Sequence, residues 1–239
     1  MLDHINLKNV LLLDIETAPI HQYFNDLTPE MQELWSQKTR FLREKGNTTA
    51  EEYYNKAGIY AEFGRIICIS TGYLRNENGK WDVRIKSFYD EDEAVLLTEF
   101  ASMLNKHFNT PDHILCGHNS KEFDFPFIAR RMLIHNVKLP GKLNIAGKKP
   151  WEISHLDTME LWKFGDYKNY TSLNLLANIF QIPTPKDDID GSDVSRVYWE
   201  EKDLKRIVEY CQKDVITVAQ LLLKFKGEPI LTQTNVAIV

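Results

Sequence analysis

The chain has 239 residues, of which 43% are hydrophobic and 26% charged, and its formal net charge at pH 7 is −5. This is the composition of an ordinary soluble globular protein, and the negative charge argues against a protein that coats nucleic acid with a basic surface. No apolar segment reaches the ~20 residues of a membrane span and the N-terminus lacks a signal-peptide pattern, so we expect a cytoplasmic protein. Cys68, Cys116 and Cys211 lie in apolar stretches without metal-site spacing, which predicts buried reduced thiols.

The first predicted element is a strand, residues 10–17, in which an apolar run ends in two carboxylates. Side chains alternate along a strand, so Asp14 and Glu16 point to one face and the neighbouring apolar side chains point to the other. Two like charges side by side at the end of a buried strand repel each other unless a cation or protons lie between them. Taken alone, the pair is explained equally well by a solvated acidic turn.

A long polar insertion, residues 18–62, follows this strand. Thr28 and Pro29 are residue types that favour the N-cap and the first position of a helix, so we expect a helix to begin there. The place of the insertion beside the acidic pair is consistent with two roles. It either covers the substrate or packs as a helical decoration on one edge of the domain.

The middle of the chain predicts two strands, a helix and a short strand. Residues 65–74 and 81–89 are rich in β-forming residues and are separated by turn residues, which indicates an antiparallel hairpin. Apolar residues at helical spacing predict a helix over residues 92–107. Residues 114–117 are short and apolar enough to form a buried strand.

The second half of the chain alternates between helices and strands. We expect a strand at 152–156 and helices at 126–135, 172–180 and 203–225. Residues 227–239 form a tail that the pattern does not assign. We expect one domain over residues 1–239. Its α/β fold should contain a mixed β-sheet, with an antiparallel hairpin on one side, parallel strands on the other, and flanking helices.

Two further polar clusters carry candidate functional residues. Asp124 stands just before the helix predicted at Pro126, where helix capping is its plain structural role. In the last helix, Tyr210 and Asp214 are four residues apart and therefore share a face, at the border of the apolar stripe. An unpaired carboxylate is costly at such a border, so a salt bridge to Lys or Arg is the structural alternative for Asp214.

Together the clusters form three motifs in order: D-x-E at Asp14 and Glu16, N-x-x-x-F-D at Asn119, Phe123 and Asp124, and Y-x-x-x-D at Tyr210 and Asp214. This order resembles the DEDD superfamily of 3′–5′ exonucleases, in the branch with tyrosine in the third motif (DEDDy). The histidine branch has its histidine five residues before the last aspartate, and that position is Glu209 here. Residues 63–70, 155–161 and 172–174 make the chain most similar to the predicted exonucleases related to proofreading domains of family B DNA polymerases. The resemblance spans residues 10 to 225.

The resemblance implies an RNase H-like fold and a phosphodiesterase that uses two divalent cations, Mg²⁺ or Mn²⁺. It gives Tyr210 the task of orienting the nucleophile, and it assigns the metal-binding roles to Asp14, Glu16, Asp124 and Asp214. Hard cations prefer oxygen ligands, and two of them about 3.5–4 Å apart can stabilise both the attacking and the leaving oxygen of an in-line displacement. The implied product is a nucleoside 5′-monophosphate released from a 3′ end.

Four further residues are candidates for substrate binding: Asn119 and Phe123 of the second motif, and Lys148 and Lys149 of a loop rich in Gly and Pro. Such a loop can hold phosphates, and an aromatic ring can stack on a terminal base. A solvated surface loop and core packing of Phe123 are the alternatives. We expect Asp157 either to support the metal ligands without binding the metal itself or to have a structural role, because the metal motif is complete without it.

The expected partners are single-stranded 3′ ends, with DNA preferred and a role in DNA repair or in proofreading in trans. An RNA-trimming 3′–5′ exoribonuclease of the ribonuclease D kind is the first alternative, since two-metal chemistry does not itself discriminate the 2′-hydroxyl. The second is a catalytically silent module that binds strand ends, which the intact motifs disfavour.

Overall fold

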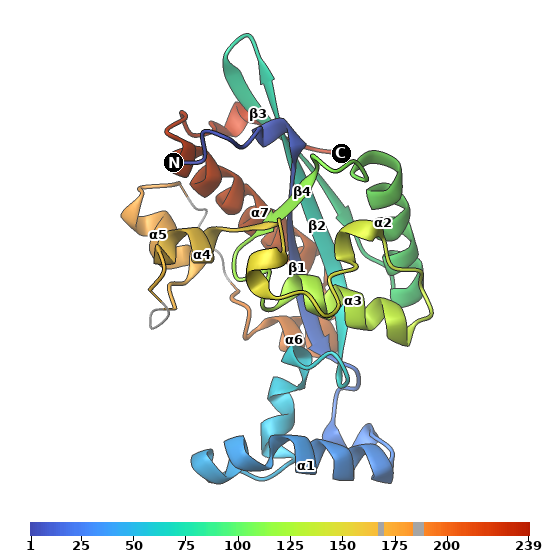
Figure 1. Ribbon diagram of the computed structural model, residues 1–239. Helices are drawn as coiled ribbons and strands as arrows, with labels where there is room; N and C mark the ends of the chain where they lie inside the picture. The colour runs from blue at the N-terminus through green and yellow to red at the C-terminus, as the bar shows by residue number, and fades with distance from the viewer. Residues whose placement is uncertain (167–169, 184–188) are drawn as a thin grey trace.

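A six-stranded mixed sheet runs through the computed structural model, which describes residues 1–166, 170–183 and 189–239, in the order β5-β4-β1-β2-β3-β6 (Figure 1). The central strand β1 (Val10–Pro19) pairs antiparallel with β2 (Gly64–Glu77) and parallel with β4 (Ile114–Gly117). β2 and β3 (Lys80–Phe88) form the predicted antiparallel hairpin. The sequence-based prediction of a mixed sheet with both kinds of pairing, flanked by helices, is therefore confirmed.

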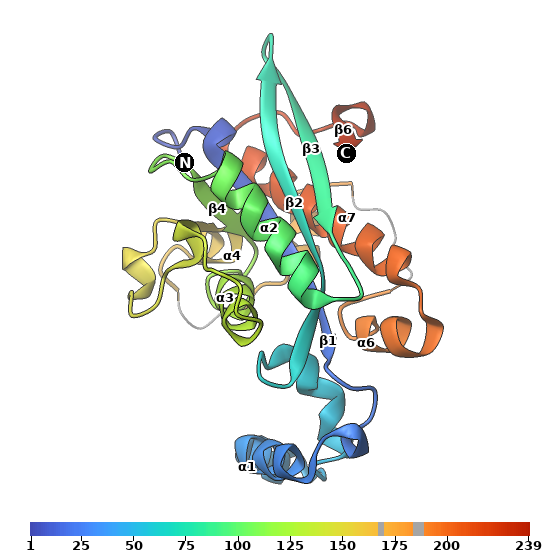
Figure 2. The same cartoon turned by 90° about the vertical axis from the view of Figure 1, so that its right-hand side faces the viewer.

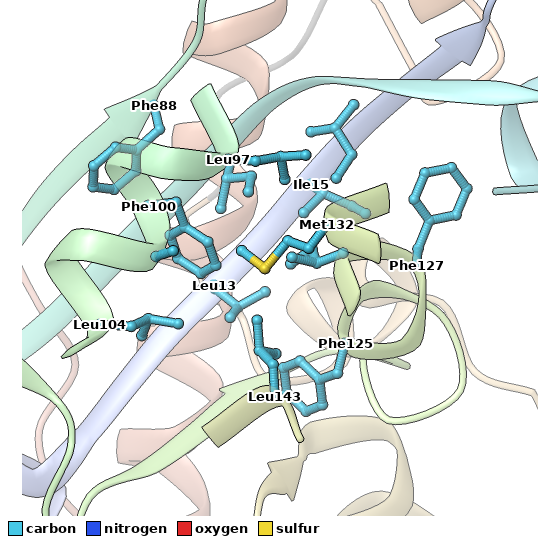
Figure 3. Packing of buried hydrophobic residues seen from close by; sticks show 14 of the residues in the cluster. Leu13, Ile15, Phe88, Leu97, Phe100, Leu104, Phe125, Phe127, Met132 and Leu143 are labelled. Atoms are coloured by element: carbon cyan, nitrogen blue, oxygen red, sulfur yellow. The ribbon is translucent and has the colours of Figure 1, made fainter. Parts of the chain in front are cut away.

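Helices cover both faces of this sheet (Figures 1 and 2). On one face, α2 (Glu93–His107) and α3 (Asp124–Ile134) bury a cluster that includes Leu13 and Ile15 of β1 (Figure 3). On the other face, the long α7 (Leu204–Lys226) buries Leu12 beneath Val215. Because the side chains of β1 alternate, Asp14 and Glu16 point to the α7 face, as Leu12 does.

A glycine lets α7 lie close to the sheet. A Cβ atom on Gly72 would lie 2.8 Å from Ile85 Cδ1 and 2.9 Å from Val215 Cγ1, closer than packed atoms approach. Gly72 pairs with Leu12 of the neighbouring strand. The missing side chain therefore brings α7 close to the strand that carries Asp14 and Glu16.

The insertion forms a small aromatic lobe beyond the end of β1 (Figure 1). Its helix α1 (Pro29–Gly46) begins as predicted, with the Thr28 hydroxyl accepting a hydrogen bond from the Met31 N–H at 3.3 Å. Trp35 is fully buried, and its ring makes edge contacts with Tyr54 and Phe63 at centroid distances of 5.6 and 5.1 Å. The lobe thus has an aromatic core of its own.

Several predicted boundaries require correction. The strand expected at 152–156 is wrong in extent, because a 3-10 turn (Pro150–Glu152) comes first and β5 is only Leu156–Asp157, paired with the last two residues of β4. The helix expected from residue 126 begins two residues earlier, at Asp124. The unassigned tail contains a strand, β6 (Val236–Ile238), which pairs parallel with β3.

The other helices flank α7. α5 (Leu173–Ile179) matches the helix predicted there, with Ser172 as its N-cap. The sequence did not predict α4 (Thr158–Lys163) or the short α6 (Val194–Arg196), which continues into a π-helical turn over Val197–Glu201. Within the described residues, no helix combines the length and apolar character needed to span a bilayer. The three cysteines are free and buried, as expected.

Candidate active site

The site forms where β4 ends and β1 continues. β4 pairs with β1 only over residues 10–12, so the following part of this edge of β1 lacks a neighbour among the described strands. The Ile15 N–H donates instead to Asp124 Oδ1, at 3.1 Å. This bond fixes the buried Asp124, at the start of α3, against the strand that carries Asp14 and Glu16.

Asp157 holds the loop that leads from β4 into α3. Its Oδ1 accepts a hydrogen bond from the Asn119 N–H at 2.9 Å, and its Oδ2 accepts one from the Lys121 N–H at 3.0 Å. A Cβ atom on Gly117 would lie 1.8 Å from Ser120 Oγ, so the loop can turn this tightly only after a glycine. Asp157 therefore has the structural role expected of it, because its contacts set the approach of α3 to β1.

α7 supplies the third side of the site. Cys211 Sγ lies 3.4 Å from Asp14 Oδ2 and 3.5 Å from the Asp14 carbonyl oxygen. Tyr210 and Asp214 are half-buried on the same helix, one turn apart on a shared face. The negative charge of Asp214 reaches both Asp14 and Glu16 and contributes to raising the pKa of each. The structure thus brings carboxylates from β1, α3 and α7 together.

The electrostatics of this cluster favour a bound cation. Burial raises the pKa of Asp14 well above its usual range, and the charges of Asp124 and Asp214 raise it further. Burial and the charge of Asp14 do the same to the pKa of Glu16. Glu16 is only 8% exposed, and within the described chain no hydrogen bond or ion pair reaches its carboxylate. Clustered carboxylate oxygens are the donor set that a hard divalent cation prefers, so these residues fit such an ion.

The burial of Asp124 gives the stability of the protein a measurable pH dependence. Burial raises its pKa to about 7 from a reference value of 3.8, so folding favours the protonated form. Its contribution to stability is therefore complete below pH ~4 and is lost as the pH rises through about 7. In buffer with a chelator, we expect wild type to lose on the order of 4 kcal/mol more unfolding free energy than Asp124→Asn between these limits. Urea unfolding from pH 4 to 8 measures it, and a pH-independent difference between the two proteins would contradict it.

The predicted substrate residues lie in different surroundings. Phe123 is half-buried and packs on Phe127 with ring centroids 5.3 Å apart, and Asn119 Oδ1 is buried without a hydrogen-bond partner in the described chain. Lys148 is exposed and lines a cavity of about 490 Å³ together with Asn119. Lys149 is exposed, with its Nζ 5.1 Å from the centroid of the Trp151 ring. Phe123 therefore packs against the core, and the two lysines lie in an exposed loop.

Sequence reasoning missed a cleft between the insertion and the segment around α6. This cleft, of about 770 Å³, is lined by Thr17, the residue after Glu16, by the insertion, and by the segment around α6. Tyr23 and Trp199 both line this cleft, and Tyr23 is 62% exposed. The aromatic residues of an otherwise polar insertion were the signal that could have indicated it. Cys211 was also missed, because its neighbours in sequence made it look like an ordinary core thiol.

Comparison with known proteins gives one family. The family model for a predicted 3′–5′ exonuclease related to the exonuclease domain of PolB matches residues 59–230. This range holds Asp124, Tyr210 and Asp214, whereas Asp14 and Glu16 precede it. No curated protein gives a significant match.

Solved structures similar to the chain include E. coli Exonuclease I in complex with a dT13 oligonucleotide, with 11% identity and a TM-score of 0.41 over 84% of this chain and 42% of that chain. The ExoI/SSB-Ct complex is similar with 11% identity and a TM-score of 0.35, over 86% of this chain and 42% of that one. The chain therefore spans about two fifths of the length of these structures.

Proposed function

The chain belongs to the family of predicted 3′–5′ exonucleases related to the exonuclease domain of PolB, and we propose that it removes nucleoside 5′-monophosphates from single-stranded 3′ ends, preferentially of DNA. The observation that carries the proposal is the convergence of buried carboxylates from three elements at the open edge of β1. Family membership makes the chain an exonuclease and hence a hydrolase. The 3′–5′ direction comes with the family, whereas the substrate and the mechanism are our inferences.

The proposal assigns the metal-holding role to four carboxylates: Asp14, Glu16, Asp124 and Asp214. Two bound Mg²⁺ or Mn²⁺ ions would supply positive charge beside the scissile phosphate and lower the pKa of a nearby water. The raised pKa values of Asp14 and Glu16 support this assignment, because a cation would relieve the repulsion that raises them. One carboxylate oxygen of Asp124 accepts a hydrogen bond from the Ile15 N–H, which holds this carboxylate beside β1.

The proposal assigns the orientation of the attacking water to Tyr210. In the proposed hydrolysis, water attacks the terminal phosphorus, the bond from phosphorus to the 3′ oxygen of the preceding nucleotide breaks, and that oxygen takes up a proton. The hydroxyl of Tyr210, one turn before Asp214, would accept a hydrogen bond from the attacking water and orient it. This role for Tyr210 corresponds to the tyrosine branch of the superfamily.

The cleft beside Glu16 supports a single-stranded substrate. It starts at Thr17 and runs between the insertion lobe and α6, with the exposed Tyr23 and the half-buried Trp199 among its lining residues. Aromatic surfaces next to a catalytic site bind single strands by stacking on successive bases, which a duplex keeps covered. The insertion therefore covers the substrate in this proposal, and nucleotides upstream of the 3′ end would lie in the cleft.

A substitution at Tyr23 tests whether the single strand lies in this cleft. We expect Tyr23→Ala to raise the KM for a single-stranded oligonucleotide by about tenfold and to leave kcat nearly unchanged, because one stacked base is lost. The side chain is 62% exposed, so stability should not change. Tyr89→Ala is the matched control, since Tyr89 is 51% exposed and does not line the cleft. Equal KM values for the two variants would exclude Tyr23 from the substrate path.

End-labelled substrates test the proposed function as a whole. DNA and RNA strands of matched sequence, labelled at the 5′ end, are incubated with Mg²⁺ or Mn²⁺ and with a chelator. We expect a ladder that shortens from the 3′ end, faster on DNA than on RNA and faster on a single strand than on a blunt duplex. A faster reaction on RNA would make the chain an exoribonuclease. Metal-dependent binding without shortening would make it a silent strand-end module.

A further inference from the structure

A thiol lies among the carboxylates of the candidate site. The ligand atoms of Asp14, Glu16 and Cys211 all lie within 4.8 Å of one another. Cys211 is fully buried on α7 and Glu16 is buried on β1, while Asp14 remains half-buried. A hard cation such as Mg²⁺ needs oxygen ligands and does not need this sulfur. The thiol therefore adds a ligand that suits a different class of metal.

The spacing of these atoms matches such a metal. Zinc binds cysteine sulfur at about 2.3 Å and carboxylate oxygen at about 2.0–2.2 Å in a tetrahedral arrangement, which sets neighbouring ligand atoms about 3.5 Å apart. Cys211 Sγ and Asp14 Oδ2 are 3.4 Å apart. The Glu16 carboxylate is 8% exposed, receives no hydrogen bond or ion pair within the described residues, and lies in the same group. It supplies a third ligand that folding has left without a partner.

We propose that Asp14, Glu16 and Cys211 form a binding site for a thiophilic divalent cation, Zn²⁺ in the first place, and that this ion inhibits the exonuclease. The inhibition rests on the proposed function of Asp14 and Glu16, whereas the binding does not. On binding, the S–H bond of Cys211 breaks, a sulfur–metal bond forms, and the proton leaves to water. Asp14 and Glu16 are then ligands of an ion anchored to α7, so they no longer serve the hard cations of catalysis.

The binding is tested with Cd²⁺, a thiophilic probe whose bond to a thiolate absorbs in the ultraviolet. Titration of the metal-free full chain should give a thiolate charge-transfer band that saturates at one Cd²⁺ per chain and that Mg²⁺ does not produce. The band should be lost in Cys211→Ser and kept in Cys116→Ser, a buried thiol on β4. A band that persists in Cys211→Ser, or no band in wild type, overturns the proposal.

Cys68 requires its own control because it pairs with Glu16 across the sheet. The band should survive in Cys68→Ser, and its loss there alone would assign the thiol to Cys68 and overturn the site. Should Cys211→Ser fail to fold, Asp14→Asn takes its place. Removing one carboxylate ligand should weaken Cd²⁺ binding by about tenfold or more, and an unchanged affinity would overturn the three-residue site.

The inhibition is measured separately as the Zn²⁺ concentration that halves the Mg²⁺-dependent rate, with each variant normalised to its own rate without Zn²⁺. We expect this concentration to rise by about tenfold in Cys211→Ser and to stay unchanged in Cys116→Ser. Wild-type and Cys211→Ser proteins equally sensitive to Zn²⁺ would overturn the inhibitory role. A chain without nuclease activity that still shows the cadmium band would contradict the proposed function and leave the binding site standing.

Discussion

Asp14→Asn is expected to lower the exonuclease rate by about a thousandfold or more, because it removes a charged ligand from the centre of the carboxylate cluster. The charges of both Asp124 and Asp214 reach Asp14 and raise its pKa. The amide occupies the same space and cannot bind a cation as strongly as a carboxylate does. Single-turnover rates on a 5′-labelled single strand, at several Mg²⁺ concentrations, measure the loss.

The same substitution should leave the fold intact or stabilise it. Burial and two nearby carboxylates raise the pKa of Asp14 well above its usual range, so its charged form opposes folding when no cation is bound. In buffer with a chelator at pH 8, Asp14→Asn should therefore unfold at an equal or higher temperature than wild type. Loss of activity together with a lower melting temperature would mean that Asp14 has a structural role, and it would remove the main support of the proposed mechanism.

The sequence could predict how these side chains lie relative to one another because local rules govern the parts of the cluster. Alternation along a strand puts Asp14 and Glu16 on one face, and helical spacing stacks Tyr210 on Asp214. The order of the motifs predicted that Asp124 joins them. No local rule predicts this, because Asp124 accepts a hydrogen bond from the Ile15 N–H, 109 residues away. That contact depends on the early end of β4, which the sequence also predicted.

The parts that could not be predicted are set by long-range packing. β5 is two residues long and β6 three, so neither carries a periodic pattern, and each is a strand only because a neighbour pairs with it. The cleft between the insertion and α6 joins segments that are more than 100 residues apart. Cys211 looked like a core thiol because its proximity to Asp14 depends on how closely α7 approaches the sheet, which Gly72 decides.

The largest expected change in stability lies behind the site, in a buried ion pair. Glu93 of α2 and Arg131 of α3 are 4% and 2% exposed, and Arg131 donates to both carboxylate oxygens, from Nε at 2.9 Å and from Nη2 at 2.6 Å. Glu93 also accepts from the Ile66 N–H at 2.8 Å, and Arg131 donates to the Ala61 carbonyl at 2.9 Å. The pair therefore joins two helices to β2 and to the end of the insertion.

Arg131→Met should cost about 3–5 kcal/mol of unfolding free energy, because it removes the guanidinium from the buried Glu93 carboxylate and leaves His135, 3.0 Å away, as its nearby ion-pair partner. Lys38→Met is the matched control. Its ion pair with Glu62, at 3.3 Å, joins side chains that are 38% and 52% exposed, so its loss should cost no more than about 1 kcal/mol. Urea unfolding at one pH and one salt concentration measures both, and equal costs would refute the importance of burial.

A double variant separates the charge from the hydrogen bonds. Glu93→Leu combined with Arg131→Met removes the buried carboxylate, so it should be more stable than Arg131→Met alone. It should not regain wild-type stability, because the Ile66 N–H and the Ala61 carbonyl lose the partners that now satisfy them. α3 also carries Asp124, so a shift of this helix should lower exonuclease activity in both variants, although neither Glu93 nor Arg131 belongs to the carboxylate cluster.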